Sequence, residues 1–79
     1  MQDDRHYGKK LVKKGGEELI FPLDTVDSDD IDDCIEKCKN EDEKKCKMVN
    51  YNHRDKKCMK YEFQDYELVE DPNFDCWRK

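Results

Sequence analysis

Long hydrophobic runs are missing from this chain. The longest apolar string is Leu19–Phe21, which is far short of the roughly 20 residues of a membrane-spanning helix. The first residues, MQDDRHYGKK, also lack the apolar segment of a signal peptide. We therefore expect no membrane insertion, and either a mature secreted domain or a cytosolic protein.

Apolar residues are scarce overall, since 34% of the 79 residues are hydrophobic and 47% are charged. One small domain of this composition has a marginal core and needs another source of stability. Five cysteines provide a candidate, because this cysteine density is typical of disulfide-bonded proteins from oxidising compartments. The net charge of −5 argues against nucleic-acid binding, which depends on neutralising phosphates.

The first part of the chain predicts a hairpin. Two strand-like runs within residues 7–23 flank Gly15-Gly16, and both glycines tolerate the positive φ of a tight turn. Residues 1–6 are polar, and we expect them to be a flexible N-terminus. This leaves residues 7–79 as a single domain.

A helix is predicted within residues 24–40. Asp27 or Ser28 can cap its start, and Asn40 can end it. Its apolar residues follow the i, i+3, i+4, i+7 spacing and so share one face: Ile31, Cys34, Ile35 and Cys38.

Alternating patterns predict the remaining strands, with a turn at residues 53–57 and another at Asp71-Pro72-Asn73. The strands are expected at residues 45–52, 58–63, 66–70 and 74–79. The aromatic residues expected in the core over the helix are Tyr51, Tyr61 and Phe63. This order of elements gives the α+β class, with one helix packed on a twisted antiparallel sheet.

The cysteine spacing limits the possible bonds. Cys34 and Cys38 lie one helical turn apart, and a bond between them would distort that turn. Cys46 and Cys58 each begin a predicted strand, so two bridges from the helix to the hairpin are favoured. A zinc site combining these four cysteines with His53 is the alternative, although zinc ribbons usually contain two close cysteine pairs.

This pattern resembles the PAN/apple domain family. The resemblance covers residues 31–63 and rests on the Cys-x3-Cys helix, on CKMVNY with Cys46, Val49 and Tyr51, and on Cys58 after a turn. It implies the nested disulfides Cys34–Cys58 and Cys38–Cys46.

Many apple domains have a third bridge between their termini. Cys76 fits its C-terminal half, but residues 1–30 contain no cysteine. Cys76 is therefore expected to be free, capped by a small thiol, or bonded to another chain in a disulfide-linked dimer. A domain cut from a longer protein is a further alternative.

The family includes modules of clotting zymogens and growth factors, parasite adhesins, and leech proteins that block platelet adhesion to collagen. The resemblance implies a secreted binding module for a protein or glycan, as in cell adhesion, with no cofactor. We expect no enzyme, since the sequence contains no evident nucleophile–base pair. Two alternatives stay open: a secreted inhibitor of host haemostasis, and a zinc-stabilised intracellular adaptor.

Three groups of residues are candidates for the binding surface. The carboxylates of an acidic cluster repel one another, and a basic partner would relieve that repulsion, although a solvated helix end would also explain the cluster. A calcium site through Asp24, Asp27, Asp29 and Asp30 is a further alternative. For a lysine patch, the resemblance to the family's growth-factor members implies binding of sulfated glycans, whereas solvated edge-strand lysines that guard against aggregation are the simpler interpretation. Trp77 is a candidate hot spot if it is exposed. The acidic cluster contains Asp29, Asp30, Asp32 and Asp33, and the lysine patch contains Lys9, Lys10, Lys13 and Lys14.

Overall fold

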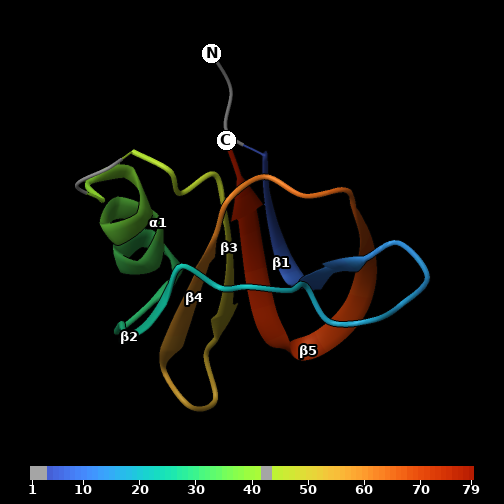
Figure 1. The fold of residues 1–79 in the computed structure, drawn as a ribbon. Helices are drawn as coiled ribbons and strands as arrows, with labels where there is room; N and C mark the ends of the chain where they lie inside the picture. Colours follow the sequence, from blue (N-terminus) through green and yellow to red (C-terminus); the bar gives the residue numbers. More distant parts are fainter. Residues whose placement is uncertain (1–3, 42–43) are drawn as a thin grey trace.

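The computed structural model describes residues 4–41 and 44–79. Five strands form an antiparallel sheet in the order β1-β5-β3-β4-β2, and α1 packs on one face of it (Figure 1). This is the α+β architecture that the sequence predicts. The elements are β1 (Asp4–Lys13), β2 (Asp24–Asp27), α1 (Ile31–Lys39), β3 (Met48–Asn52), β4 (Lys57–Tyr61) and β5 (Tyr66–Arg78).

The first predicted hairpin is wrong in its second arm. The turn itself is present, because the Gly16 N–H donates to the Lys13 carbonyl at 2.9 Å and both Gly15 and Gly16 have positive φ. Residues 17–22 form no strand, however, and β1 pairs with β5 instead. The long β5 satisfies more backbone groups of β1 than the short run before Pro22 can.

The turn predicted at residues 71–73 is a bulge within β5 and does not separate two strands. The register of β1 and β5 shifts at Gly8, which alone faces residues 71–74. Gly8 has a φ of 68°, and its N–H donates to Asp75 Oδ1 at 3.0 Å. Such bulges bend a strand, and β5 is strongly curved in Figure 1.

The helix begins later than predicted. Residues 24–27 form β2, which pairs with β4, so neither Asp27 nor Ser28 is the cap. Asp30 is the N-cap instead, and its carboxylate accepts a backbone N–H of the first turn at 2.8 Å. Asn40 ends the helix, as predicted. The sequence offers several equivalent capping residues, and the pairing of β2 decides among them.

Two disulfides fasten α1 to the sheet, in the pairing that the resemblance implies. Cys34 is bonded to Cys58 on β4, and Cys38 is bonded to Cys46 just before β3. The four helix residues predicted to share one face are all buried. Covalent links of this kind compensate for the thin core of a small domain.

Both faces of the sheet carry a core, because successive strand residues point to opposite sides. Tyr51 packs under the helix as predicted, whereas Tyr61 lies on the other face. The prediction for Phe63 is wrong, since this residue is 59% exposed. The helix-side core contains Ile31, Ile35, Val49, Tyr51, Trp77 and both disulfides. The second core contains Leu11, Leu19, Met48, Tyr61 and Cys76.

Asn50, a buried polar residue in the centre of β3, closes the second core. Its side-chain amide accepts the Leu11 N–H and donates to the Leu11 carbonyl, both at 2.8 Å. Leu11 lies on β1, although β5 separates β1 from β3 in the sheet. The two bonds therefore hold the curled β1 over the face of the sheet.

The first strand of the chain, β1, begins beside the end of the last strand, β5. We expected residues 1–6 to be flexible; residues 4–6 begin β1 and pair with residues 76–78 of β5. Residues 1–3 lie outside the described residues. Within residues 4–41 and 44–79, no helix has the length and apolar character needed to cross a membrane.

Candidate functional site

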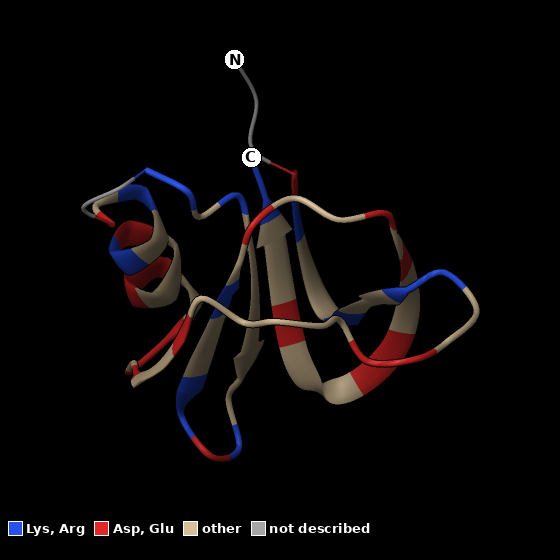
Figure 2. Ribbon diagram, viewed as in Figure 1, with Lys and Arg blue, Asp and Glu red and all other residues tan. Residues whose placement is uncertain are grey.

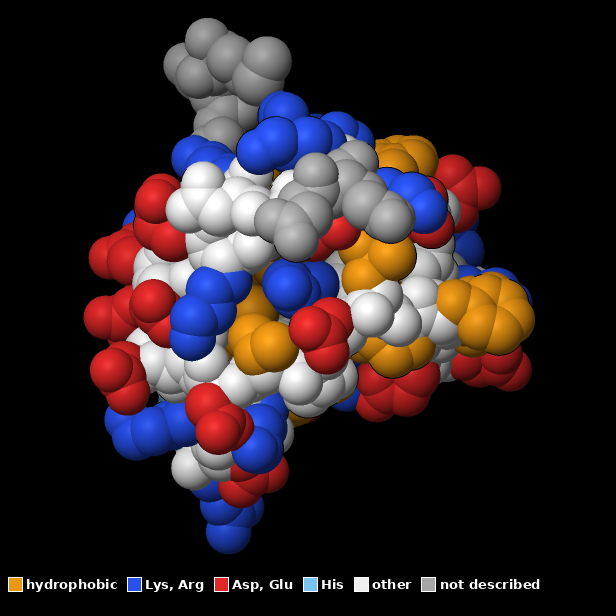
Figure 3. Space-filling view, turned by 60° about the vertical axis from the view of Figure 1, so that its left-hand side comes forward, with side chains coloured by type: hydrophobic (Ala, Val, Ile, Leu, Met, Phe, Trp, Pro, Cys, Tyr) orange, Lys and Arg blue, Asp and Glu red, His pale blue; other side chains and the backbone are white. Residues whose placement is uncertain are grey.

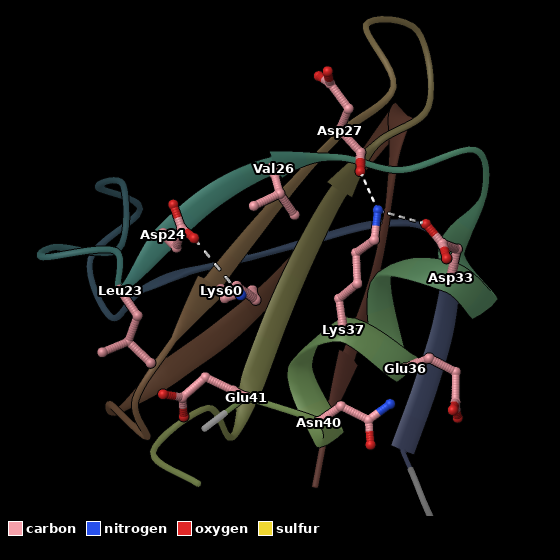
Figure 4. A pocket seen from close by; sticks show the side chains of 10 residues that line it. All are labelled: Leu23, Asp24, Val26, Asp27, Asp33, Glu36, Lys37, Asn40, Glu41 and Lys60. Carbon is pink, nitrogen blue, oxygen red and sulfur yellow. Dashed lines mark hydrogen bonds and ion pairs between the residues drawn. The ribbon is translucent and has the colours of Figure 1, made fainter. Parts of the chain in front are cut away.

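An open groove of about 930 Å³ lies between α1 and β2 (Figure 4). Leu23 and Val26 supply its apolar surface and pack against the helix-side core. Figure 3 brings this side of the molecule forward and shows apolar side chains surrounded by charged ones. The groove is lined by Leu23, Asp24, Val26, Asp27, Asp33, Glu36, Lys37, Asn40, Glu41 and Lys60.

Lys37 links the two walls of the groove. Its Nζ donates to the Asp27 carbonyl oxygen at 2.5 Å and lies 3.0 Å from Asp33 Oδ2 (Figure 4). The hydrogen bond from Lys37 lowers the pKa of Asp33 below its ordinary value. Asp33 is therefore charged at neutral pH, and Lys37 is already paired with a carboxylate of the protein itself.

Lys60 rises from β4 into the groove. Its side chain is only 10% exposed, and its Nζ lies 3.9 Å from Asp24 Oδ2. Its backbone carbonyl accepts the Leu23 N–H at 2.7 Å, which fixes the start of β2 beside it. An ammonium group has three donors, and this long ion pair is the one polar interaction of the Lys60 side chain with the described residues. Lys60 can therefore donate a hydrogen bond to a ligand oxygen.

The groove is acidic overall, because five of its lining residues are carboxylates and two are lysines. Asp27 pairs with Lys57 on β4 at 2.5 Å, and the hydrogen bond from Lys57 lowers the pKa of Asp27. Glu36 makes no ion pair with any residue that the structure describes. This balance favours ligands that are basic or rich in hydrogen-bond donors over sulfated ones.

The acidic cluster of the sequence does not form one surface. Only Asp33 lines the groove. Asp30 caps the helix, and Asp32 pairs with Arg5 of β1 at 2.5 Å. Asp29 is exposed beside a smaller hollow. The cluster is therefore divided between helix capping, an ion pair to β1 and the groove.

The lysine patch is not a purely basic surface, because two of its lysines pair with carboxylates. Lys9 pairs with Glu70 at 3.5 Å, and Lys10 pairs with Glu18 and lies 4.4 Å from the centre of the Phe74 ring. Figure 2 shows blue and red segments interspersed along the ribbon. The four lysines lie on β1 and the turn after it, and none of them lines the groove.

Trp77 cannot be the exposed hot spot considered from the sequence. It is 1% exposed and belongs to the helix-side core. The Nζ of Lys39 lies 5.7 Å from the centre of its ring. The alternation along β5 places Trp77 under the helix, where this large side chain contributes more to a thin core than any smaller residue.

Cys76 is free and completely buried. Burial raises the pKa of its thiol to about 12. A buried, protonated thiol is neither nucleophilic nor within reach of a second chain. This placement favours the free thiol among the states predicted for Cys76 and disfavours a disulfide-linked dimer.

The metal hypotheses find no support in the described geometry. The disulfides remove all four thiolates on which the zinc alternative depended. His53 lies on the turn between β3 and β4, with its Nε2 4.0 Å from Asp75. Across residues 4–41 and 44–79, no three His, Cys, Asp or Glu side chains are grouped to hold a metal ion.

The sequence analysis missed most of the residues that build the groove. Val26 lies in a segment that reads as the start of the helix, and Lys60 is one of many lysines in a charged chain. The available signal was the apolar Val26 between Asp24 and Asp27, the pattern of a half-buried strand. To recognise this segment as a strand, its long-range pairing with β4 would also have had to be predicted.

Comparison with protein families gives a match over nearly the full length of the chain. The family model of the PAN domain matches residues 4–77. No curated protein matches the chain. The matched residues include α1, both disulfides and nearly all of the sheet, so the match extends well beyond the cysteine motif.

Proposed function

The chain belongs to the PAN domain family, and on this premise we propose that it is a secreted binding module for a protein or glycan, without catalytic activity. PAN domains are generally non-catalytic modules that bind proteins or carbohydrates. The two disulfides support secretion, because such bonds persist in oxidising compartments. The burial of Cys76, the one free thiol among the described residues, supports the absence of thiol catalysis.

The groove between α1 and β2 is the observation that carries this proposal. It combines apolar side chains with a few fixed polar groups, which is the usual composition of a ligand site. Lys60 offers hydrogen-bond donors, and Glu36 offers a carboxylate that no described residue neutralises. A basic protein segment or a neutral glycan suits this lining better than a sulfated glycan.

The experiment is a binding screen of the purified protein against a glycan array and a panel of extracellular proteins. Collagen and clotting factors belong in the panel, because inhibition of haemostasis is one protein-binding role within the proposal. Two charge-matched variants locate the site. Glu36→Lys changes the groove, and Glu17→Lys makes the same change on the turn after β1.

A ligand of the groove should lose roughly tenfold or more in affinity with Glu36→Lys, as expected when a charge that lines the site is reversed, and keep its affinity with Glu17→Lys. Equal losses in both variants, or no loss in either, would contradict a role for the groove. Binding of heparin in preference to uncharged glycans would contradict the proposed ligand class.

A further inference from the structure

The apolar string Leu19–Phe21 is divided between the core and the surface. Leu19 is buried in the second core, whereas Phe21 is 85% exposed. Phe63, in the loop after β4, is also largely exposed. Ile20, Phe21 and Phe63 line one open hollow of about 260 Å³, together with Glu62 and Gln64. Exposed apolar side chains brought together in this way mark an interaction surface more often than scattered ones do.

Gln64 holds the two segments of the hollow together. Its Oε1 accepts the Ile20 N–H at 3.2 Å, and its Nε2 donates to the Ile20 carbonyl at 2.7 Å. The ring of Phe63 makes an edge-to-face contact with Tyr66, with centroids 6.4 Å apart. The hollow is therefore built by specific contacts between segments that are distant in the sequence, and both of its walls are positioned before any partner arrives.

The backbone of Phe21 is in an unfavourable conformation. Its φ is 54°, in the left-handed region that bulky residues rarely adopt. Core packing does not explain this cost, because the ring points away from the core into solvent. Strain of this kind is concentrated at ligand-contacting sites, where the surrounding structure maintains it.

The size of the hollow limits its occupant. Pockets for small molecules measure roughly 300–1,000 Å³ and enclose most of the ligand, whereas this hollow of about 260 Å³ is smaller and open. It has room for one large side chain of another protein. Anchor side chains of this kind supply most of the energy of a protein interface.

The charge of the hollow places a second requirement on its occupant. Glu62 lines the hollow and forms no ion pair with the part of the chain that the structure describes. We propose that the Ile20–Phe21–Phe63 hollow docks a protein segment that carries an aliphatic or aromatic side chain next to a Lys or Arg, which pairs with Glu62. The hollow shares no lining residue with the groove, so this second contact surface stands independently of the proposed function.

The test is selection of a phage-displayed random peptide library on the full chain. The selected peptides are expected to share an aliphatic or aromatic residue adjacent to a Lys or Arg. Their affinity should fall roughly tenfold or more with Phe21→Ser, with Phe63→Ser and with Glu62→Lys. Thermal unfolding of each variant checks that these surface changes leave the fold intact.

Matched controls locate the effect. Tyr7→Ser removes another aromatic residue that is 63% exposed, and Glu17→Lys reverses a charge outside the hollow. Both should leave the peptide affinity unchanged, as should the groove variant Glu36→Lys. Peptides that depend equally on Tyr7, or that ignore Phe21 and Phe63, would overturn the proposal.

Three other outcomes would also overturn it. One is the absence of specifically enriched peptides. Another is enrichment of acidic peptides, which would contradict the role of Glu62. The third is binding to vesicles of phosphatidylcholine and phosphatidylserine that is lost with Phe21→Ser, which would identify a lipid surface as the occupant.

Discussion

His6 on β1 lies directly opposite Cys76 on β5 in the antiparallel register. Opposed residues of antiparallel strands point to the same face, and their Cα atoms are about 4.5 or 5.5 Å apart. Both separations fall within the range that a disulfide spans. Position 6 is therefore suited to the terminal bridge that many apple domains contain and this chain lacks.

His6→Cys is expected to form this third disulfide with Cys76. The intact mass should show the loss of two further protons, and thermal stability should rise. The loop between the two residues is long, so the model-dependent upper limit of the gain is roughly 4 kcal/mol before strain. Tyr7→Cys is the control, because its opposite residue is Asp75 and its side chain points to the other face. Equal alkylation of both variants under non-denaturing conditions would contradict the inferred geometry.

The native thiol of Cys76 is expected to resist alkylation. Burial holds its pKa at about 12, above the ordinary value of 9.0, so little thiolate exists at mildly alkaline pH. Iodoacetamide should leave the native protein unlabelled and add one label after denaturation with the disulfides intact. Rapid labelling of the native protein, or a dimer on a non-reducing gel, would show that Cys76 is accessible.

The same shift in pKa gives Cys76 a pH-dependent effect on stability. The folded state holds the thiol proton more tightly than the unfolded chain does. Its contribution is therefore complete below about pH 9 and is lost as the pH rises toward 12. Over this range, Cys76→Ala should lose less unfolding free energy than the wild type, as measured by denaturant titrations.

Local patterns predicted the elements whose structure depends on nearby residues. The buried helix face of Ile31, Cys34, Ile35 and Cys38 follows from a 3.6-residue period, and the central hairpin follows from alternation around a turn. The disulfide pairing came from the family resemblance, because spacing alone favoured two bridges without deciding between the pairings.

Long-range pairing accounts for what the sequence did not reveal. The partner of β1 is β5, at the opposite end of the chain, and the short β2 is a strand only because β4 pairs with it. The groove and the hollow both depend on these pairings. Phe63 illustrates the limit of prediction from local patterns. Its position in the alternating pattern predicts burial, but β4 ends at Tyr61 and Phe63 lies exposed in the loop that follows.

The two disulfides should differ in their effect on stability. The Cys34–Cys58 bond closes the longer loop, and on a chain-entropy model its removal with Cys34→Ser and Cys58→Ser lowers the unfolding free energy by roughly 3.5 kcal/mol. Removal of the bond that closes the shorter loop, with Cys38→Ser and Cys46→Ser, lowers it by roughly 2.5 kcal/mol. Urea unfolding at fixed pH measures both. Unchanged stability of the first double variant would contradict the conclusion that the bridges hold α1 on the sheet.

Asn50 is expected to be the polar residue on which the position of β1 depends. Asn50→Leu conserves much of the volume but leaves the Leu11 N–H and carbonyl, which the amide now satisfies, without partners on the sheet. Each buried group left unsatisfied costs roughly 1–3 kcal/mol, so the loss of both partners should cost the variant about 2–6 kcal/mol of unfolding free energy. Hydrogen exchange of the Leu11 amide should accelerate far more than that of Val49 in the helix-side core.

Asn52→Leu provides the matched control, because Asn52 lies on the same strand and, among the described residues, its side chain forms hydrogen bonds only with the turn that follows. It should affect that turn and leave Leu11 exchange unchanged. If Asn50→Leu proved as stable as the wild type, with slow Leu11 exchange, apolar packing alone would hold β1 in place. The curl of β1 over the sheet would then follow from the Gly8 bulge and the burial of Leu11, with no need for the amide.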